Sequence, residues 1–378
     1  MNTLSTILST TSSEHWQDWR WQLKHAARSL EDLKQLDLIN NVHTDISSNH
    51  YETLSRQYKT LITPYYLSLI DFSDPHCPIK KQAIPHLDEL IETSGELSDP
   101  IGDQAHSPQD ILVHRYPDRA LLFPTFECPM YCRYCFRKET LNDSKVKLHQ
   151  SLPQALSYIR SQKQLEEIIL SGGDPLMLST AKLAKLFEGL HQAGIKRLRI
   201  HSRMVVTLPQ RINDELTDLF TSHQPNFNLK LVTHFNHPRE LSRDAQLAIE
   251  RLLKSGVRIF NQSVLLKGVN DHSTILAQLS KGLDKYNITP YYLHHPDLTR
   301  GTQHFRCSID RGLEIYKALR GHISGYLIPR YVLDIPQGGG KVEVNSHAVR
   351  KGFADGEWIL NSPLNGKDHY YNDLAYQS

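Results

Sequence analysis

The stretch Cys128-Pro-Met-Tyr-Cys132-Arg-Tyr-Cys135 decides how this chain is interpreted. Three of the five cysteines in 378 residues lie in this stretch, directly after an apolar run, Leu121–Phe126, that is typical of a β-strand. The cysteines are therefore expected on the loop that leaves the C-terminal end of that strand. Three thiolates gathered on one loop are characteristic ligands of soft metals and of iron–sulfur clusters.

Structural zinc is the alternative interpretation of this loop. Zinc sites usually take four protein ligands, often as two CxxC pairs, whereas the other two cysteines, Cys77 and Cys307, are isolated. One of the 21 histidines could still complete a Cys3His site. Ligand softness and ligand number favour a [4Fe–4S] cluster, in which three thiolates leave one iron open to an exogenous ligand.

The composition is that of an ordinary globular protein. Hydrophobic residues make up 39% and charged residues 22% of the chain, which is long enough for one large core with appendages or for two domains. The net charge of +2 does not indicate a nucleic-acid partner, and no apolar run is long enough to span a membrane. Met1–Ser9 lacks the features of a signal peptide. Because clustered thiolates need a reducing compartment, we expect a cytoplasmic protein.

From Leu112 onward, short β-rich runs alternate with amphipathic helical stretches. Six such units predict an α/β fold with a parallel sheet and outer helices, and they fall short of the eight units that close a TIM barrel. We therefore expect a partial (βα)6 barrel over residues 108–325, with an N-terminal helical arm (1–107) and a lysine loop with a short C-terminal extension (326–378). The predicted strands are Leu121–Phe126, Glu167–Leu170, Arg197–His201, Leu229–Thr233, Val257–Gln262 and Pro290–His294.

Helices are predicted from apolar residues at a spacing of three to four. In the arm, a helix capped by Ser12 or Ser13 should carry Trp16, Trp19, Leu23 and Ala26 on one face. The other predicted helical stretches are Ser29–Leu36, Tyr51–Leu69, Pro153–Arg160, Ala181–Ala193, Arg239–Lys254 and Ser273–Tyr286.

Polar residues follow five successive predicted strands, which is more than helix capping explains. Gly172-Gly173-Asp174 gives backbone room for a ligand and adds a carboxylate, although the triplet alone is a weak signal. Together with CxxxCxxC, it resembles the radical S-adenosylmethionine (SAM) enzymes, in which SAM chelates the open iron and a loop of this kind holds its amino group. Ser202, at the end of the third strand, joins this candidate SAM site.

A second anchor is Asp334-Ile-Pro-Gln-Gly338-Gly339-Gly340-Lys341. It does not match a P-loop, because the required first glycine and the final Ser or Thr are absent. A flexible turn with an exposed lysine is the plain alternative. The functional interpretation is a lysine on a backbone without Cβ atoms that would obstruct a planar cofactor, which suits a Schiff-base lysine for pyridoxal phosphate (PLP).

Taken together, these stretches resemble the lysine 2,3-aminomutase family of radical SAM enzymes. The likeness extends from about Trp16 to about Val344. Its motifs include Asp18-Trp-Arg-Trp-Gln-Leu, His114-Arg-Tyr-Pro-Asp-Arg119, Cys128–Cys135, Ser171-Gly-Gly-Asp174, Thr233-His-Phe-Asn-His-Pro238, Asn261-Gln-Ser-Val-Leu-Leu266, His304-Phe-Arg306, Gly321–Pro329 and the Gly-Gly-Gly-Lys341 loop.

The resemblance implies a role for each matching residue. Cys128, Cys132 and Cys135 would bind the [4Fe–4S] cluster, and Lys341 would be the PLP lysine. The remaining implied contacts are Arg115, Tyr116 and Arg119 with PLP, His234 and Gln262 with SAM, Arg137 with the substrate carboxylate, and Asp297 and Asp334 with the distal ammonium of the substrate.

Two buried carboxylates would independently favour a cationic side chain and penalise an anionic one. The plain alternative is that Asp297 caps a helix after Thr299 and that Asp334 merely ends a strand. The chain also departs from the family pattern, because Gln337 replaces a usual glycine and Arg300 could neutralise Asp297. Some relatives bind zinc through C-terminal cysteines, and none follows Cys307 here, so no zinc is expected.

The implied activity is that of an isomerase which converts L-lysine to β-lysine with the cluster, SAM and PLP, supplied by an electron donor such as flavodoxin or ferredoxin. We expect a homo-oligomer. The alternatives are an enzyme that makes β-lysine for attachment to elongation factor P, a 2,3-aminomutase for another amino acid such as arginine, and a non-catalytic iron–sulfur electron carrier, which would leave Lys341 without a purpose.

Overall fold

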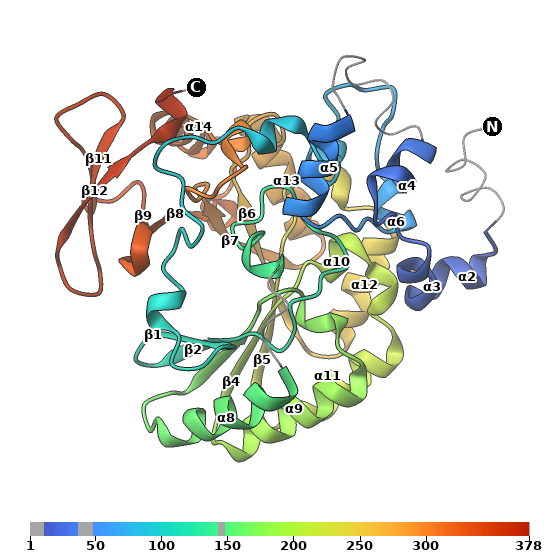
Figure 1. Cartoon of the computed structure of the whole chain (residues 1–378). Coiled ribbons are helices and arrows are strands. Elements are labelled where there is room, and N and C mark those ends of the chain that lie inside the picture. Colours follow the sequence, from blue (N-terminus) through green and yellow to red (C-terminus); the bar gives the residue numbers. More distant parts are fainter. Residues whose placement is uncertain (1–10, 37–47, 143–147, 378) are drawn as a thin grey trace.

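The computed structural model describes residues 11–36, 48–142 and 148–377. Its main feature is one curved sheet of nine strands in the order β1 to β9, so neighbours along the chain are neighbours in the sheet (Figure 1). The strands β2 to β8 run parallel, while β1 and β9 are antiparallel to their neighbours. Within the described residues no ladder joins β1 to β9, so the sheet is an open barrel.

Five of the six predicted strands agree with the structure to within two residues at each end, whereas the strand predicted at Leu121–Phe126 lies at Arg119–Leu122. Both β3 and β4 have the predicted ends, and a seventh parallel strand, β8, was missed. The predicted α/β class with a partial barrel is confirmed. The strands of the sheet are β1 Leu112–Tyr116, β2 Arg119–Leu122, β3 Glu167–Leu170, β4 Arg197–His201, β5 Asn228–Thr233, β6 Arg258–Val264, β7 Ile288–His294, β8 Arg330–Ile335 and β9 Gly340–Glu343.

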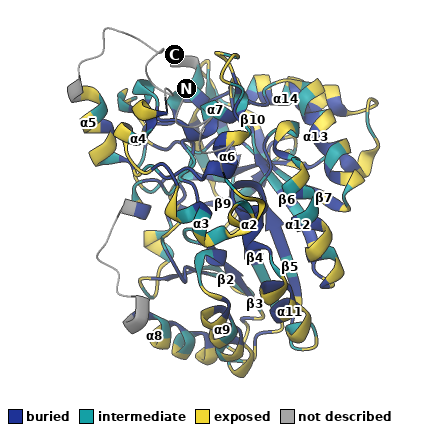
Figure 2. Ribbon diagram, turned by 90° about the vertical axis from the view of Figure 1, so that its right-hand side faces the viewer, coloured by how far each residue is buried: buried dark blue, intermediate teal, exposed yellow. Residues whose placement is uncertain are grey.

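Helices cover the outer face of the sheet (Figure 2), because alternate strand residues are apolar and pack against them. In β4, Leu198 and Ile200 are buried in one hydrophobic cluster with residues of α9 and α11, while Arg199 and His201 lie on the opposite, inner face. The outer helices are α8 Leu148–Ser161, α9 Thr180–Gln192, α11 Asp214–His223, α12 Arg243–Lys254, α13 Ser273–Lys285 and α14 Ile309–Leu319, and a short α10 spans Met204–Thr207.

The first helix of the arm was predicted to be continuous, and this prediction is wrong. Two helices, α2 (Ser13–Gln17) and α3 (Trp19–Lys24), replace it, because Asp18 is extended and its carboxylate accepts a hydrogen bond from the backbone N of Arg20 (2.9 Å). The predicted stretch Tyr51–Leu69 is likewise divided. Its helices are α5 (Ser48–Gln57) and α6 (Pro64–Ser68), and Pro64 stands at the first turn of the second one.

The arm packs on the barrel. Tyr66 in α6 donates a hydrogen bond to Glu240 (2.9 Å), and the Thr63 hydroxyl donates to the carbonyl of Thr207 (2.8 Å). The other helices of the arm are α4 (Leu30–Gln35) and α7 (Pro78–Ala83). None of the helices in the described ranges has the length and hydropathy needed to cross a bilayer. The prediction that Met1–Ser9 is no signal peptide falls on residues outside the described ranges.

The C-terminal extension forms a second sheet, with strands β10 (Val349–Lys351), β11 (Glu357–Asn361) and β12 (Asp368–Asn372) in an antiparallel arrangement (Figure 1). It packs on the loop before Lys341, where the Ser362 hydroxyl donates to the carbonyl of Gly339 (2.7 Å). The division at residues 107 and 325 remains a proposal, and β8 lies beyond the second boundary although it pairs with β7.

Candidate active site

The cysteine loop follows β2 and lies against the loop that follows β3. The backbone N of Gly173 donates to the carbonyl of Thr125 (2.9 Å), and that of Asp174 donates to the carbonyl of Glu127 (2.8 Å). A Cβ on Gly172 or Gly173 would lie 2.7 Å from the Thr125 oxygen or 2.4 Å from the Glu127 oxygen. These glycines therefore serve the contact between the two loops, whereas the sequence had suggested room for a ligand.

The three predicted cluster ligands lie close enough together to affect one another electrostatically. Burial, and then the neighbouring negative groups, raise the pKa of the Cys128 thiol well above its usual range and that of Cys135 to about 11. Thiolates at these positions therefore need a positive partner, which the irons of a cluster supply. Three free cysteines on one loop suit a [4Fe–4S] cluster, in which each cysteine binds a different iron.

Arg203, after β4, is a site residue to which the sequence assigned no role. Its Nη1 donates to Sγ of Cys132 (2.9 Å), and its Nη2 donates to Glu240 (2.6 Å) and to the side chain of Gln82 (2.7 Å). A buried guanidinium in this position stabilises negative charge on the cysteine sulfur. Its place at a strand end was the available signal in the sequence.

The side chains of Asp174 and Ser202 form hydrogen bonds with each other. The Ser202 hydroxyl donates to both carboxylate oxygens of Asp174 (2.8 and 3.0 Å), and the backbone N of Arg203 and Leu176 also donate to that carboxylate. Burial raises the pKa of Asp174 to about 6. The pair thus ties the end of β3 to the end of β4 and fixes the loops that follow these strands.

His234 and Gln262 come from neighbouring strands. Nε2 of His234 lies 3.1 Å from the hydroxyl of Tyr134, and burial holds the pKa of His234 well below its usual range, so the ring is neutral. Gln262 lies within β6, where no described residue forms a hydrogen bond with its side chain. Its amide therefore remains available to a ligand.

Lys341 lies in β9, directly opposite Asp334 in the ladder. Its Nζ forms an ion pair with the Asp334 carboxylate, lies 3.3 Å from Nδ1 of His294, and stands 5.5 Å from the centre of the Tyr292 ring. Burial and then the Lys341 charge lower the pKa of His294 to about 4. Burial would raise the pKa of Asp334, but Lys341 and His294 together outweigh this effect, so the pKa is lowered and the carboxyl is ionised.

The glycines before Lys341 are enclosed by protein. A Cβ on Gly338 would lie 2.3 Å from Cε1 of His106, and one on Gly339 would lie 2.4 Å from Cγ2 of Ile335. The glycines thus let the loop pack, whereas the sequence had suggested access for a cofactor. Gln337 adopts a left-handed backbone (φ 59°), which costs about 1 kcal/mol and explains why glycine suits this position.

The three other predicted PLP residues lie along β1 and β2. The backbone N of Lys341 donates to the Tyr116 hydroxyl (3.2 Å), so this contact joins the first and last strands of the open sheet. Arg119 lies over the Tyr116 ring (3.9 Å to its centre) and pairs with Asp118 (2.7 Å). Arg115 instead pairs with Asp103 (3.2 Å). Arg119 is therefore linked to Lys341 only through its contact with the Tyr116 ring.

Asp297 follows β7 beside Asp334. Burial and then the Asp334 charge raise the pKa of Asp297 to about 8, against the influence of Lys341 and Arg137. The next helix, η7 (Gln303–Phe305), has Thr302 and not Asp297 at its N-cap, so the capping alternative is wrong for Asp297. Arg300 is half-exposed and lies 3.9 Å from the carboxylate of Glu139. It is not among the main charges that shift the pKa of Asp297, so it does not neutralise that carboxylate.

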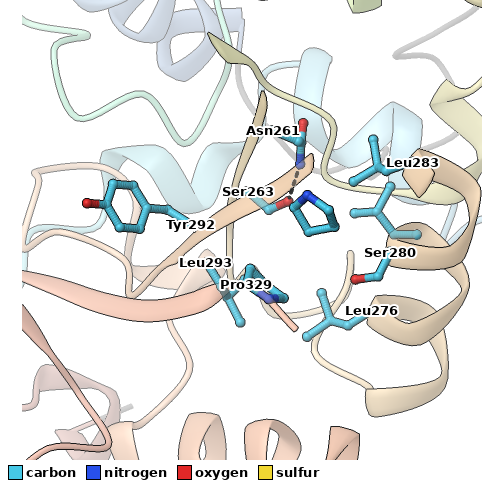
Figure 3. Close-up of a pocket in the computed structure, with 10 residues that line it drawn as sticks. Asn261, Ser263, Leu276, Ser280, Leu283, Tyr292, Leu293 and Pro329 are labelled. Atoms are coloured by element: carbon cyan, nitrogen blue, oxygen red, sulfur yellow. Dashed lines mark hydrogen bonds between the residues drawn. The ribbon is translucent and has the colours of Figure 1, made fainter. Parts of the chain in front are cut away.

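A small hollow lies between β6, β7 and α13 (Figure 3) and shares Tyr292 with the surroundings of Lys341. In it, the Asn261 amide donates to the Ser263 hydroxyl (2.9 Å). We do not assign it to the active site because most of its lining is apolar. The lining residues are Asn261, Ser263, Leu276, Leu279, Ser280, Leu283, Pro290, Tyr292, Leu293 and Pro329.

Comparison with protein families gives two matches. The model of the radical SAM superfamily matches residues 122–278, which hold the cysteine loop and strands β3 to β6. The model described as lysine-2,3-aminomutase matches residues 316–350, which hold β8, β9 and Lys341.

Several characterised proteins are similar over most of their length. The L-lysine 2,3-aminomutase of Fusobacterium nucleatum is 40% identical over 352 residues, which cover 91% of this chain and 80% of that protein. The L-lysine 2,3-aminomutase of Clostridium subterminale is 40% identical over 348 residues, covering 91% and 81%. The glutamate 2,3-aminomutase of Clostridioides difficile is 34% identical over 349 residues, covering 92% and 81%.

Proposed function

Because the chain belongs to the lysine 2,3-aminomutase family of radical SAM enzymes, we propose that it is an isomerase that moves the α-amino group of L-lysine to C3 and forms β-lysine. The family implies a [4Fe–4S] cluster, SAM and PLP. When bound, the cluster and SAM supply hydrogen-atom abstraction, and PLP carries the migrating amino group. The observation that carries the choice of substrate is the partly buried carboxylate pair, Asp297 and Asp334.

The proposal assigns opposite charges to the two ends of the substrate. Asp297 and Asp334 lie at the carboxyl ends of β7 and β8, and no described group donates a hydrogen bond to the Asp297 carboxylate. Arg137, on the cysteine loop, is near enough to lower the pKa of Asp297. Arg137 would therefore bind the α-carboxylate of lysine, while the acidic pair would bind its distal ammonium.

Lys341 would hold PLP until the amino group of the substrate replaces it. The leaving lysine amine then needs partners in the site. Nδ1 of the neutral His294, 3.3 Å from Nζ, can accept a hydrogen bond from this amine, and the Asp334 carboxylate can hold it as an ammonium. Both groups thus support proton transfer at Nζ.

The other predicted site residues complete the proposal. Cys128, Cys132 and Cys135 would hold the cluster, with Arg203 beside Cys132. Arg115, Tyr116 and Arg119 would face PLP, and the loop of Gly172, Gly173, Asp174 and Ser202 with His234 and Gln262 would face SAM. An external one-electron donor such as flavodoxin or ferredoxin, a homo-oligomeric state and a cytoplasmic location belong to the same proposal.

Glutamate is the rival substrate, because a glutamate 2,3-aminomutase is among the relatives. A glutamate side chain would place a further negative charge beside the ionised Asp334, which a desolvated site penalises. Arginine would satisfy the same pair and differs from lysine by the length of its side chain. The names of the relatives do not favour the alternative in which β-lysine serves elongation factor P.

Removing either member of the acidic pair should weaken lysine turnover. Loss of one partner of a buried charge pair typically costs ~2–5 kcal/mol, so we expect kcat/KM for lysine to fall roughly 30-fold or more in Asp297→Ala and in Asp334→Ala. Steady-state kinetics with anaerobically reconstituted protein would measure this fall, together with the iron and PLP contents, which should be unchanged in Asp297→Ala.

Asp310→Ala is a matched control, since that carboxylate pairs with Lys351 near the surface and should leave turnover unchanged. Unaltered lysine kinetics in both pair variants would overturn the assignment. So would a fall that is equally large for glutamate, because the pair would then not act on a distal cation.

Lysine binding should depend on pH through Asp297. The ordinary pKa of an aspartate is about 3.9, whereas burial and the Asp334 charge raise the pKa of Asp297 to about 8, so the ligand-free carboxyl is protonated at neutral pH. The distal ammonium favours the ionised form, and lysine binding should release this proton below pH 8. We expect lysine affinity to rise by up to about tenfold per pH unit from pH 6 to 8 and then to level off.

Titration of PLP-loaded protein with lysine in the absence of SAM would measure this dependence without turnover. Asp297→Asn should remove most of the slope. An affinity that is constant or falls between pH 6 and 8 in the wild type would contradict the assignment of Asp297.

A further inference from the structure

The segment from Leu97 to His106 connects parts of the candidate site that are far apart in the sequence. At its start, the backbone N of Leu97 donates to the carbonyl of Leu298 (2.8 Å), next to Asp297. Further along, a Cβ on Gly102 would lie 2.5 Å from the backbone of Gln337, in the loop before Lys341. The sequence had assigned this segment only to the N-terminal arm, so it is an unexpected part of the site.

Asp103 lies in this segment between two predicted ligand-binding arginines. One carboxylate oxygen, Oδ2, accepts hydrogen bonds from Nε (3.1 Å) and Nη2 (2.8 Å) of Arg137, and the other, Oδ1, accepts one from Nη2 of Arg115 (3.2 Å). The exposed fractions of the three side chains are only 14%, 12% and 7% for Asp103, Arg137 and Arg115. The carboxylate is therefore a largely buried bridge between the two guanidiniums.

The backbone around Asp103 is itself fixed. Asp99 accepts hydrogen bonds through its carboxylate from the backbone N of Asp103 and of Gln104, both at 2.9 Å. Nδ1 of His106 lies 2.9 Å from the carbonyl of Gly102. Asp103 thus stands on a short, internally bonded turn, so the position of its carboxylate does not depend on the two arginines alone.

We propose that Asp103 is a positioning residue that orients Arg137 for the carboxylate of the amino acid substrate. This inference rests on the proposed function, because it takes Arg137 as the carboxylate-binding group. The guanidinium lies 4.8 Å from the ring centre of Phe123 and 4.3 Å from that of Phe136, and Asp103 occupies its Nε and Nη2. No described residue accepts a hydrogen bond from Nη1, so that edge of the fixed fork is left for the substrate.

The charges of these side chains indicate that Asp103 orients Arg137 and does not compete with the substrate carboxylate for it. Arg115 and Arg137 carry two positive charges and Asp103 carries one negative charge, so the three side chains together keep a net charge of +1. A second carboxylate, that of the substrate, is therefore still attracted to the pair of guanidiniums. Asparagine could not replace Asp103, because its amide offers one acceptor oxygen to two guanidiniums and turns an N–H donor towards one of them.

Binding of lysine and of 1,5-diaminopentane, the same molecule without its carboxylate, tests this role. The measurement uses full-length, cluster-reconstituted, PLP-loaded protein without SAM and follows the change in PLP absorbance as each amine displaces Lys341. In Asp103→Asn we expect the Kd of lysine to rise at least about tenfold. The Kd of 1,5-diaminopentane should change less than about twofold, because it makes no contact with Arg137.

Two further variants sharpen the comparison. Asp110→Asn makes the same chemical change at an exposed position nearby and should leave both Kd values unchanged. Asp103→Glu keeps the charge and both acceptor oxygens, so it should recover part of the preference for lysine over the diamine. Iron and PLP contents of all variants show whether the protein has folded and loaded normally.

Three outcomes would overturn the inference. Equal weakening of lysine and diamine binding would give Asp103 a merely structural role, tighter lysine binding would make it a competitor of the substrate, and unchanged binding would give it no role. Failure of the proposed function looks different, because a wild type that forms no β-lysine, or that binds lysine no better than the diamine, fails before any variant is compared.

Discussion

Anaerobically reconstituted Cys132→Ala protein is expected to contain almost no iron, whereas the wild type should contain about four iron atoms per chain. Cys132 shares one loop with Cys128 and Cys135, and a cluster held by three thiolates has no spare protein ligand. Activity should be lost entirely, because the electron that starts each reaction comes through the cluster. Iron analysis measures the first part of this prediction, and an assay of β-lysine formation measures the second. The electron paramagnetic resonance spectrum of the reduced wild-type protein should change when SAM is added.

The chain offers matched controls for this experiment. Cys77 and Cys307 are buried cysteines outside the loop, with exposed fractions of 1% and 5%, and their replacement by alanine should leave the iron content intact. The cluster assignment fails if wild-type protein takes up stoichiometric zinc and no iron. It also fails if Cys132→Ala and Cys307→Ala lose iron to the same extent.

The second large effect is expected from Lys341→Ala, which should lower kcat at least about 100-fold through loss of the group that positions PLP. Borohydride reduction of the wild-type protein should attach PLP covalently to Lys341, because its Nζ lies beside the neutral His294 and pairs with Asp334. Mass spectrometry of the peptides locates the label, and absorbance spectra report whether PLP is attached before reduction.

Lys351→Ala is the control, since this exposed lysine lies ten residues further along the chain and pairs with Asp310 on the surface. It should retain both PLP and activity. A label on another lysine, together with full activity in Lys341→Ala, would show that the loop before β9 has a different purpose.

The parallel strands could be predicted from the sequence because they are short apolar or alternating runs between amphipathic helices. In β4, two buried aliphatic residues alternate with Arg197, Arg199 and His201, and the predicted bounds agree with the structure. Strand β8 was missed because its pairing with β7 is a long-range contact that follows the Gly325–Leu327 turn and is not encoded in local periodicity. The alternation of apolar runs and helices along the chain thus predicted the α/β fold class. The last parallel strand, β8, depends on its tertiary pairing with β7.

The cysteine loop and Lys341 were recognisable because their chemistry is unusual in sequence. Asp103 was not, since an aspartate among turn residues is common and its two arginine partners lie 12 and 34 positions away. The glycines were identified correctly as special, but for another reason. Gly173 and Gly338 are needed because Glu127 and His106 occupy the space of a Cβ, and such contacts depend on the folded arrangement of the loops.

The arm shows how a local preference can outweigh a helical pattern. Trp16, Trp19 and Leu23 have helical spacing and all three pack against the core, as the apolar stripe suggested. Asp18 nevertheless interrupts the helix between the two tryptophans, because its carboxylate caps the next helix. A capping residue within an amphipathic stripe therefore deserves as much weight as the stripe itself.

The central claim is tested most directly by reconstituting the wild-type protein anaerobically with iron, sulfide, PLP and SAM, reducing it, and screening amino acids for β-isomers. Lysine should give β-lysine with the highest kcat/KM among lysine, arginine, glutamate and alanine, because Arg137 and the Asp297–Asp334 pair match its two charged ends. Faster conversion of glutamate or alanine than of lysine would contradict this account of the substrate, and no β-isomer from any of them would contradict the proposed aminomutase activity.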